Sequence, residues 1–352
     1  MRVLVTGHLG YLGPAVVGTL LAEGHDVTGL DSGLFSSCVL EREPDIATIF
    51  KDVRDVEVAD LFGYDAIVHL AALSNDPMGF LDPARTNEVN ALATVRLASL
   101  ARDAGVGRFL QSSSCSVYGA PAEPWVDEAS RPMPVTPYGV SKVTAERGLS
   151  ELASPDFCVV SLRNATAFGY TSRLRTDLVV NDFVSNAYLR REVRLNSDGS
   201  AWRPLVHAQD IARAFSMALL APAELINGAV FNVGEEEQNY TVLQIAQAVL
   251  QAVPGATLSM SSGAPTDQRS YRVRFDRLHQ LLPAFRCQYR LEDGIRDLLS
   301  NLRRVGFDSS AGHSRIEHLQ TLMRQGDVDE NLRLRAPLLA ASRSNGKAPE
   351  PA

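Results

Sequence analysis

The sequence lacks long hydrophobic runs and closely spaced cysteines, and each absence excludes a class of protein. No uninterrupted apolar stretch approaches the ~20 residues that a membrane-spanning helix needs. The apolar run at residues 3–6 is too short to form the core of a secretion signal. The four cysteines are far apart and form neither a CxxC motif nor a Cys/His cluster, which argues against a metal site and against a secreted disulfide framework. We therefore predict a cytoplasmic protein with no metal site and no membrane span.

Positive charge is also scarce. The chain has 34 lysines and arginines against 41 aspartates and glutamates, which gives a net charge of -7. Non-specific binding of nucleic acid depends on clustered cations, so we expect no nucleic-acid partner. A small phosphorylated ligand remains compatible with this composition, because a pocket can be positive on an acidic protein. The 352 residues, of which 45% are hydrophobic, are enough for one large domain or two coupled ones.

Strand and helix patterns alternate through the first half of the chain. Short apolar runs predict buried parallel strands, and stretches with helical spacing lie between them. This alternation indicates an α/β fold with a doubly wound parallel sheet, the Rossmann architecture. The predicted strands are residues 2–6, 26–31, 65–71, 108–113 and 157–163, and the predicted helices are residues 14–23, 89–104 and 138–153.

The rhythm changes near residue 165, where loops lengthen and arginines become frequent. We predict a helix at 206–220 and a strand at 229–233 that return to the sheet, and an amphipathic helix at 241–252. We assign residues 1–165 and 205–235 to the Rossmann domain. A smaller mixed α/β region on the C-terminal side, residues 166–204 and 236–335, would bind the substrate. The small and polar residues 336–352 predict a disordered tail.

A glycine-rich turn, TGHLGYLG at residues 6–13, lies between the first predicted strand and helix. Gly7 allows a tight turn, Gly10 lets the backbone approach a pyrophosphate, and Gly13 lets the helix pack closely on the strand. The helix N-terminus then offers free N–H groups to the phosphates. Asp31 ends the second strand, where a carboxylate receives the adenosine ribose hydroxyls and repels a 2′-phosphate, so we predict NAD rather than NADP. The predicted cofactor contacts here are Gly7, Leu9, Gly10, Tyr11, Leu12, Gly13 and Asp31.

Tyr138 and Lys142 form a Tyr-x-x-x-Lys pattern that places both side chains on one face of a predicted helix. An ammonium beside a phenol favours the phenolate and lowers the phenol pKa, which makes Tyr138 a candidate general acid/base. Upstream, the serine-rich segment SSSCSVYG at residues 112–119 follows a predicted strand, where parallel sheets place their ligands. A hydroxyl in this segment can hold a substrate oxygen next to Tyr138.

The glycine turn, the serine segment and the Tyr-x-x-x-Lys pair, in this order and spacing, resemble the extended short-chain dehydrogenase/reductase family, in its sugar-nucleotide epimerase/dehydratase branch. The resemblance covers roughly residues 1–300. It implies that Ser114 holds the sugar C4 oxygen, that Tyr138 is the base, and that Lys142 binds the nicotinamide ribose. The further cofactor contacts that it implies are Asp52, Val53, Leu70, Ala71, Ala72, Asn90 and Ser112, together with Tyr138 and Lys142.

The same resemblance extends to the substrate half. The segment WRPLVH at residues 202–207 is similar to the family segment whose arginine binds the substrate diphosphate, which implies that role for Arg203. Arg269 is a second candidate for a phosphate or base contact. In the segment at residues 172–183, Asn181 matches a substrate-side amide, and Arg173 and Arg175 could reach the sugar or the diphosphate.

Two departures from the family pattern refine the expected reaction. Dehydratases of this branch carry an Asp-Glu pair directly after the hydroxyl residue, where this chain has Cys115 and Ser116. Neither is a good acid or base at neutral pH, so 4,6-dehydration is disfavoured, whereas epimerases have small residues there. Thr166 occupies the position of a family asparagine that contacts the substrate, and Asn164 is displaced from it. By position, Cys115, Ser116 and Thr166 are therefore candidate substrate contacts together with Ser114.

The resemblance therefore implies an NAD-dependent nucleotide-sugar epimerase that oxidises the sugar, at C4, to a keto intermediate and reduces it again. A nucleotide-sugar 4-dehydrogenase or ketoreductase of the same fold is the main alternative, followed by a dehydratase or decarboxylase. A non-catalytic NAD-binding protein would have little reason to retain Ser114, Tyr138 and Lys142 together. The partner is a nucleotide-diphosphate sugar, and the family expectation is a homodimer formed through the helices at 89–104 and 138–153.

Overall fold

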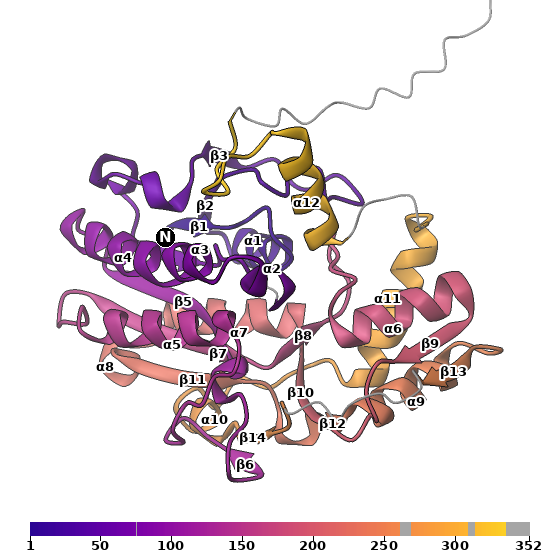
Figure 1. Ribbon diagram of the computed structural model, residues 1–352. Helices are drawn as coiled ribbons and strands as arrows, with labels where there is room; N and C mark the ends of the chain where they lie inside the picture. The colour runs from indigo at the N-terminus through magenta and orange to yellow at the C-terminus, as the bar shows by residue number, and fades with distance from the viewer. Residues whose placement is uncertain (75, 261–268, 309–313, 336–352) are drawn as a thin grey trace, which may run out of the picture.

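A seven-stranded sheet forms the centre of the computed structural model, which describes residues 1–74, 76–260, 269–308 and 314–335 (Figure 1). The strand order is β11-β7-β5-β4-β1-β2-β3, and every neighbouring pair is parallel. The order reverses direction between β1 and β4, and a crevice forms at such a point outside the carboxyl ends of the strands. The strands are β1 (Arg2–Thr6), β2 (Asp26–Asp31), β3 (Ala47–Phe50), β4 (Ala66–His69), β5 (Arg108–Ser114), β7 (Cys158–Asn164) and β11 (Ala229–Val233).

Both faces of the sheet are covered, because each central strand is apolar on both sides. Val3 and Val5 of β1 pack into one core with α1 (Gly13–Ala22) and α7 (Ala208–Leu220). Leu4, between them, points into the second core, with α4 (Ala93–Asp103) and α5 (Pro137–Ser150). All three β1 side chains are fully buried. This arrangement confirms the predicted doubly wound α/β sheet.

Most predicted elements of the first half are present, with small shifts at their ends. The predicted helix at 206–220 begins too early, because Val206 and His207 belong to β10 (Trp202–His207). His207 instead precedes α7, and its Nδ1 accepts a hydrogen bond from the backbone N–H of Gln209 at 3.2 Å. The predicted helix at 89–104 opens with a π-helical turn, η3 (Glu88–Leu92), before α4.

Three small sheets form the second part of the molecule. They join β12 (Asn239–Thr241), β10 and β8 (Thr166–Phe168); β13 (Thr257–Met260) and β9 (Glu192–Leu195); and β14 (Arg272–Val273) and β6 (Trp125–Val126). Helices α6 (Val179–Arg190), α9 (Val242–Ala252) and α11 (Leu291–Arg304) pack on one another beside them. The shorter helices are α2 (Asp76–Leu81), α3 (Pro83–Asn87), α8 (Ala223–Ile226) and α10 (Asp276–Leu281), and the 3₁₀ turns are η1 (Val53–Asp55), η2 (Val58–Leu61), η4 (Cys115–Tyr118) and η5 (Glu236–Gln238).

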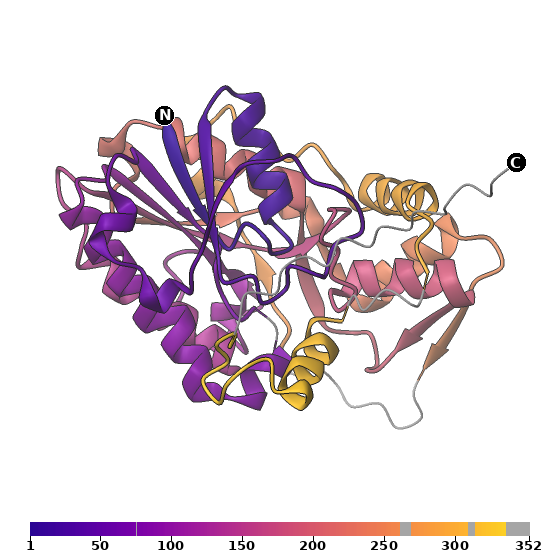
Figure 2. The same ribbon diagram turned by 90° about the horizontal axis from the view of Figure 1, so that it is seen from above.

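The last helix, α12 (Arg315–Gln325), does not continue the α6–α9–α11 group. It lies instead beside the β2–β3 end of the large sheet, away from α11 (Figures 1 and 2). The proposed division of the chain into domains stays a prediction, and the predicted tail at 336–352 lies outside the described residues. Among the helices that the structure describes, none has the length and hydrophobicity needed to cross a membrane.

Candidate active site

A cavity of about 1290 Å³ opens at the carboxyl ends of the central strands, where the strand order reverses. Its wall includes the glycine turn after β1, Asp31 at the end of β2, the loop after β4, Ser114 at the end of β5, and Tyr138 of α5. It extends to Arg203 and Arg269 in the second part of the molecule. The three sequence motifs therefore meet around one cavity.

The glycine turn has the close backbone packing that its pattern predicts. Gly7 has a φ of +72°, its N–H donates to the Leu30 carbonyl at 2.8 Å, and a Cβ there would lie 2.5 Å from the Ala71 nitrogen. A Cβ on Gly13 would lie 1.8 Å from the His8 carbonyl oxygen. Neither position accepts a side chain, so the backbone itself forms the floor of the groove, as binding of a dinucleotide pyrophosphate requires.

Asp31 is held at the end of β2 by two backbone N–H groups. One carboxylate oxygen accepts from Leu9 at 3.0 Å and the other from Gly33 at 2.9 Å. These bonds fix the carboxylate in the cavity wall, and each oxygen retains lone-pair capacity for a ribose hydroxyl. The residues present therefore fit NAD, whose pyrophosphate would lie over Gly7 and Gly10.

Replacing Asp31 with alanine is expected to raise the Kd for NAD at least about tenfold, because hydrogen bonds to charged groups contribute about 1.5–3 kcal/mol. The Kd for NADP should fall relative to that for NAD, since the carboxylate that repels a 2′-phosphate is gone. Titration calorimetry with both dinucleotides measures the two changes. Asp26→Ala, at the exposed start of the same strand, is the matched control. Unchanged NAD affinity in Asp31→Ala would show that the ribose binds elsewhere.

Most of the other predicted cofactor contacts also line the cavity, and two do not. Gly13 lies in the first turn of α1, behind the loop. Asn90 is fully buried: its Oδ1 accepts from the Leu73 N–H at 2.8 Å, and its Nδ2 donates to Ser141 Oγ at 3.1 Å. Asn90 thus joins the loop after β4 to α5 and can act only through them. The predicted residues in the wall are Gly7, Leu9, Gly10, Tyr11, Leu12, Asp31, Asp52, Val53, Leu70, Ala71, Ala72, Ser112, Tyr138 and Lys142.

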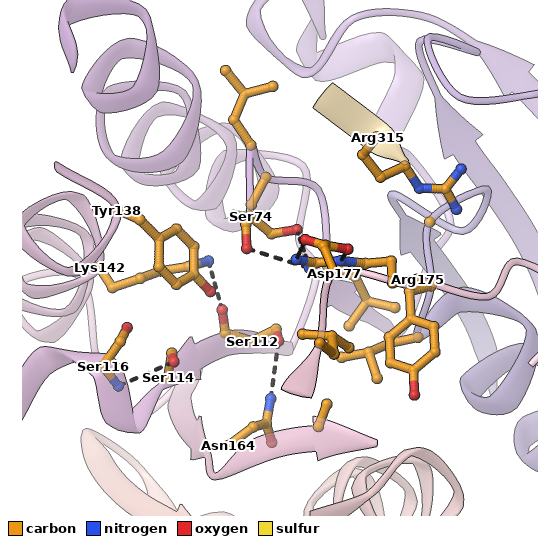
Figure 3. Close-up of a pocket in the computed structure, with 18 of the residues that line it drawn as sticks. Ser74, Ser112, Ser114, Ser116, Tyr138, Lys142, Asn164, Arg175, Asp177 and Arg315 are labelled. Carbon is orange, nitrogen blue, oxygen red and sulfur yellow. Dashed lines mark hydrogen bonds and ion pairs between the residues drawn. The ribbon is translucent and has the colours of Figure 1, made fainter. Parts of the chain in front are cut away.

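Tyr138 and Lys142 project from the first two turns of α5 toward the end of β5 (Figure 3). Thr136 begins this helix, since its Oγ1 accepts from the Gly139 N–H at 3.1 Å. The Lys142 ammonium lies 5.6 Å from the centre of the Tyr138 ring and donates to the Ser112 carbonyl at 2.7 Å. Sequence spacing on α5 and the end of β5 therefore bring phenol, ammonium and serine hydroxyls to one place.

Burial gives Lys142 an unusual electrostatic state. Its side chain is 2% exposed, and desolvation lowers its pKa to about 8, while the Glu146 carboxylate opposes the shift. Glu146, one helical turn away, is held by Arg163, which binds its two oxygens at 3.0 and 2.7 Å. Lys142 thus keeps its proton next to Tyr138 at neutral pH, and burying this charge lowers the stability of the folded state.

The two residues after Ser114 face different ways. Cys115 is buried and outside the cavity wall, where its thiol donates to the Arg163 carbonyl at 3.2 Å, and burial raises its pKa. Ser116 lines the cavity, and its N–H donates to Ser114 Oγ at 3.1 Å. The structure therefore does not bring Cys115 to the substrate side, and no carboxylate directly follows Ser114.

The end of β7 and the start of β8 bring two polar residues to the cavity, where one was predicted. Thr166, the predicted contact, lines it, and so does the displaced Asn164. Asn164 Nδ2 donates to Ser112 Oγ at 3.0 Å, whereas its Oδ1 is buried with no hydrogen-bond partner among the described residues (Figure 3). That oxygen is an acceptor available to a ligand.

The arginines of the substrate half divide into two groups. Arg203 and Arg269 line the cavity, and Arg203 donates to the main-chain carbonyls of Trp202 and Arg269. Arg173 does not reach it, because its Nε binds both Glu43 oxygens at 2.9 and 2.8 Å. Arg175 lines the wall instead, paired with Asp177 (Figure 3).

Asn181 also lies outside the cavity wall. It is fully buried, its Oδ1 accepts from the Gly169 N–H at 3.0 Å, and its Nδ2 donates to the Tyr11 hydroxyl at 3.3 Å. Its role is to support Tyr11, which lines the cavity. Other wall residues were not singled out from the sequence. They include Leu34, Phe35, Asn196 and Tyr271 in loops, Asp182 on α6, and Arg315 and Leu332 in the C-terminal segment.

Comparison with known proteins agrees with this geometry. Residues 3–234 match the model of the NAD dependent epimerase/dehydratase family. A UDP-glucose 4-epimerase from Mycolicibacterium smegmatis is 32% identical over 290 residues, which cover 80% of this chain and 88% of that one. A dTDP-D-glucose 4,6-dehydratase from Mus musculus is 25% identical over 84% of this chain and 86% of its own. The solved structure of MoeE5 in complex with UDP-glucuronic acid and NAD has a TM-score of 0.75 and 27% identity, with 86% of this chain and 99% of that one covered.

Proposed function

The chain belongs to the NAD dependent epimerase/dehydratase family and is an NAD-dependent enzyme, and from this premise we propose that it epimerises the sugar of a nucleotide sugar at C4. The observation that carries the proposal is the meeting of Ser114, Tyr138 and Lys142 in one cavity with the dinucleotide groove. UDP-glucose is the first substrate to test, since the Mycolicibacterium smegmatis relative is a UDP-glucose 4-epimerase.

The residues around the cavity have separable tasks in this reaction. NAD, when bound, supplies the chemistry of accepting and returning a hydride. The Tyr138 oxygen takes the proton of the sugar C4 hydroxyl and later gives it back, while Ser114 hydrogen-bonds the same sugar oxygen. Lys142 holds a positive charge beside Tyr138. Anchored on the Ser112 carbonyl of β5, it would also hold the cofactor ribose.

The far end of the cavity suits the diphosphate and the sugar. Arg203 and Arg269 supply cationic groups for the phosphates. Asn164 Oδ1 and Ser116 Oγ, both buried without a partner in the described structure, offer hydrogen bonds to sugar hydroxyls. Once the keto sugar leaves its contacts at C4, it can turn about its phosphate linkage and present its other face to the cofactor.

Epimerisation is favoured over dehydration by the residues after Ser114. Removal of water across C5 and C6 needs an acid and a base close to that bond. Here Cys115 is directed away from the cavity, and burial raises the pKa of its thiol. Ser116 has no acidic proton at neutral pH. An epimerase needs neither group.

The proposal predicts isomerisation without net redox change. Incubated with NAD and UDP-glucose, or with a panel of dTDP-, GDP-, CDP- and ADP-sugars, the enzyme should interconvert C4 epimers, seen by proton NMR. Absorbance at 340 nm should show no NADH accumulating with turnover. NADH formed in proportion to substrate would indicate a dehydrogenase instead. A product that has lost one water molecule would indicate a dehydratase.

A cytoplasmic homodimer completes the proposal. Leu92 and Val140, on the helical segments predicted to pair, are 59% and 46% exposed, as an apolar interface between two copies would require. The four cysteines form no disulfide, which suits a reducing compartment. No nucleic-acid or membrane partner is proposed.

A further inference from the structure

The C-terminal segment Ser314–Arg335 lies against the nucleotide half of the molecule. Leu319 and Leu322 of α12, with Val328 and Leu332 after it, form a separate apolar cluster with Leu34, Leu73 and partly buried neighbours. None of these four side chains is more than 8% exposed. A segment with this much buried apolar surface is part of the folded core and not an appendage.

This cluster bridges the two sides of the dinucleotide groove. Leu34 lies in the loop after β2, and Leu73 lies in the loop after β4. β2 and β4 are the two neighbours of β1, whose glycine turn forms the floor of the groove. A segment packed on both loops therefore spans the groove, and Figure 1 shows α12 on that side of the sheet.

Polar contacts hold the segment at both ends. At its start, His318 Nε2 lies 2.9 Å from the Leu34 carbonyl oxygen, and Arg315 donates to the Arg173 carbonyl at 3.0 Å. Near its end, the buried Arg54 donates to the Asn331 carbonyl at 2.8 Å, and Arg333 pairs with Asp55. Arg54 also binds Asp52, a residue of the cavity wall.

Leu332 is the residue that these contacts bring to the cavity. It lines the wall, as do Asp52 and Val53. Its φ is +56°, a left-handed conformation that is costly for a bulky residue. Such strain persists only where the surroundings impose it, and here Asn331 and Arg333 are fixed on either side.

We propose that Ser314–Arg335 is a wall of the NAD site, with the Leu332 side chain packed on the adenine, and that this wall slows the release of NAD. The position of Leu332 relative to NAD follows from the direction of the groove. The nicotinamide would lie at the end with Tyr138 and Lys142, and the adenosine ribose beside Asp31. Leu332, near Asp52 and Val53 through the Arg54 contacts, lies at the adenine end. The inference rests on the proposed function only in that NAD occupies the groove.

Retention of NAD suits the proposed reaction. An epimerase returns the hydride within each turnover, so it has no need to exchange its cofactor. An enzyme that releases NADH would be slowed by a wall that must move at every cycle. A wall that retains NAD is therefore more compatible with an epimerase, which reduces and reoxidises its bound cofactor in every turnover, than with a dehydrogenase.

The test compares NAD release from Leu332→Gly with release from Leu334→Ala. Glycine adopts a positive φ without strain, so Leu332→Gly keeps the turn and removes only the side chain. Leu334 packs on the same cluster and is not in the cavity wall, which makes it the matched control. The rate is followed by chasing bound NAD with a large excess of fluorescent etheno-NAD.

Release from Leu332→Gly should be roughly tenfold faster than from the wild type, as expected when one leucine loses its burial against a ligand. Release from Leu334→Ala should stay within about twofold. A chain that ends at residue 313 should lose NAD on gel filtration, whereas one that ends at Arg335 should retain it. Should the shorter chain fail to fold, Leu332→Gly alone decides.

An unchanged release rate in folded Leu332→Gly would overturn the inference and leave the proposed function intact. Equal acceleration in Leu334→Ala would also overturn it, because the effect would then be general loosening of the segment. If the wild-type chain itself bound no NAD, the proposed function would fail first.

Discussion

Tyr138→Phe is expected to lower kcat about a thousandfold, within the 10²–10⁴ range that a positioned general acid/base contributes. Phenylalanine keeps the ring that lies 5.6 Å from the Lys142 ammonium, so the packing at the start of α5 is preserved. Only the oxygen that exchanges the C4 proton is removed. The affinity for NAD should change by less than about threefold, because the glycine turn and Asp31 are untouched.

The measurement is kcat for epimerisation together with the Kd for NAD. Tyr64→Phe provides the matched control, since Tyr64 packs under Arg2 outside the cavity wall and loses the same hydroxyl. A Tyr138→Phe enzyme that kept a tenth or more of the wild-type kcat would remove Tyr138 from the role of base. Loss of NAD binding in the same variant would instead show that the phenol mainly holds the cofactor.

The large sheet could be predicted from sequence because its strands are buried on both faces. Such strands are short apolar runs, and the bounds predicted for β2 and β11 agree with the structure. β3 was not predicted, because it has only four residues and Thr48 interrupts its apolar residues; none of the four is buried in the structure. The start of α7 was misplaced because Val206 and His207 continue an apolar pattern that belongs to β10.

The candidate site could be predicted where motif residues lie on strands or helices of that sheet. Side chains at the ends of β1, β2 and β5 and on the first turns of α5 have directions fixed by the local backbone. Residues away from that sheet, in loops and on α6, are different, because distant partners decide where they point. Glu43, 130 positions away, takes Arg173 out of the cavity wall, and Tyr11 and Gly169 do the same for Asn181.

The segment Ser314–Arg335 is the clearest example of a part of the cavity wall that sequence motifs could not predict. Leu332 is 301 positions from Asp31 in the chain, yet both line one cavity. Nothing in the residues around Leu332 distinguishes it from any other leucine in a polar stretch. Its place depends on the apolar cluster with Leu34 and Leu73, which exists only after the sheet has formed.

Lys142→Met is expected to lower kcat by about 10²–10³, since it removes the charge that favours the Tyr138 phenolate. It should also stabilise the fold at pH 7. The folded-state pKa of Lys142 is about 8, against 10.5 for the free side chain. A shift of this size corresponds to about 3 kcal/mol of unfavourable burial when the ammonium is charged. Loss of the hydrogen bond to the Ser112 carbonyl offsets about 1 kcal/mol, so a net gain of about 2 kcal/mol remains.

The pH dependence distinguishes this explanation from a general packing effect. Below pH 8 both the folded and the unfolded chain bind the proton, and the folded wild type carries the full cost of the buried charge. Between pH 8 and 10.5 the folded chain releases the proton first, so wild-type stability relative to the variant rises with pH. Urea unfolding of NAD-free protein should therefore show that the stability gained by Lys142→Met is smaller at pH 10 than at pH 7.

Lys51→Met is the opposite control: its hydrogen bond to Asp60 raises the pKa of Lys51, so its removal should destabilise the fold. An advantage for Lys142→Met that is equal at both pH values would mean that the ammonium is not what burial penalises. The loss of activity and the gain in stability in Lys142→Met would then have separate causes. The position of Lys142 on α5 instead assigns both effects to one buried ammonium.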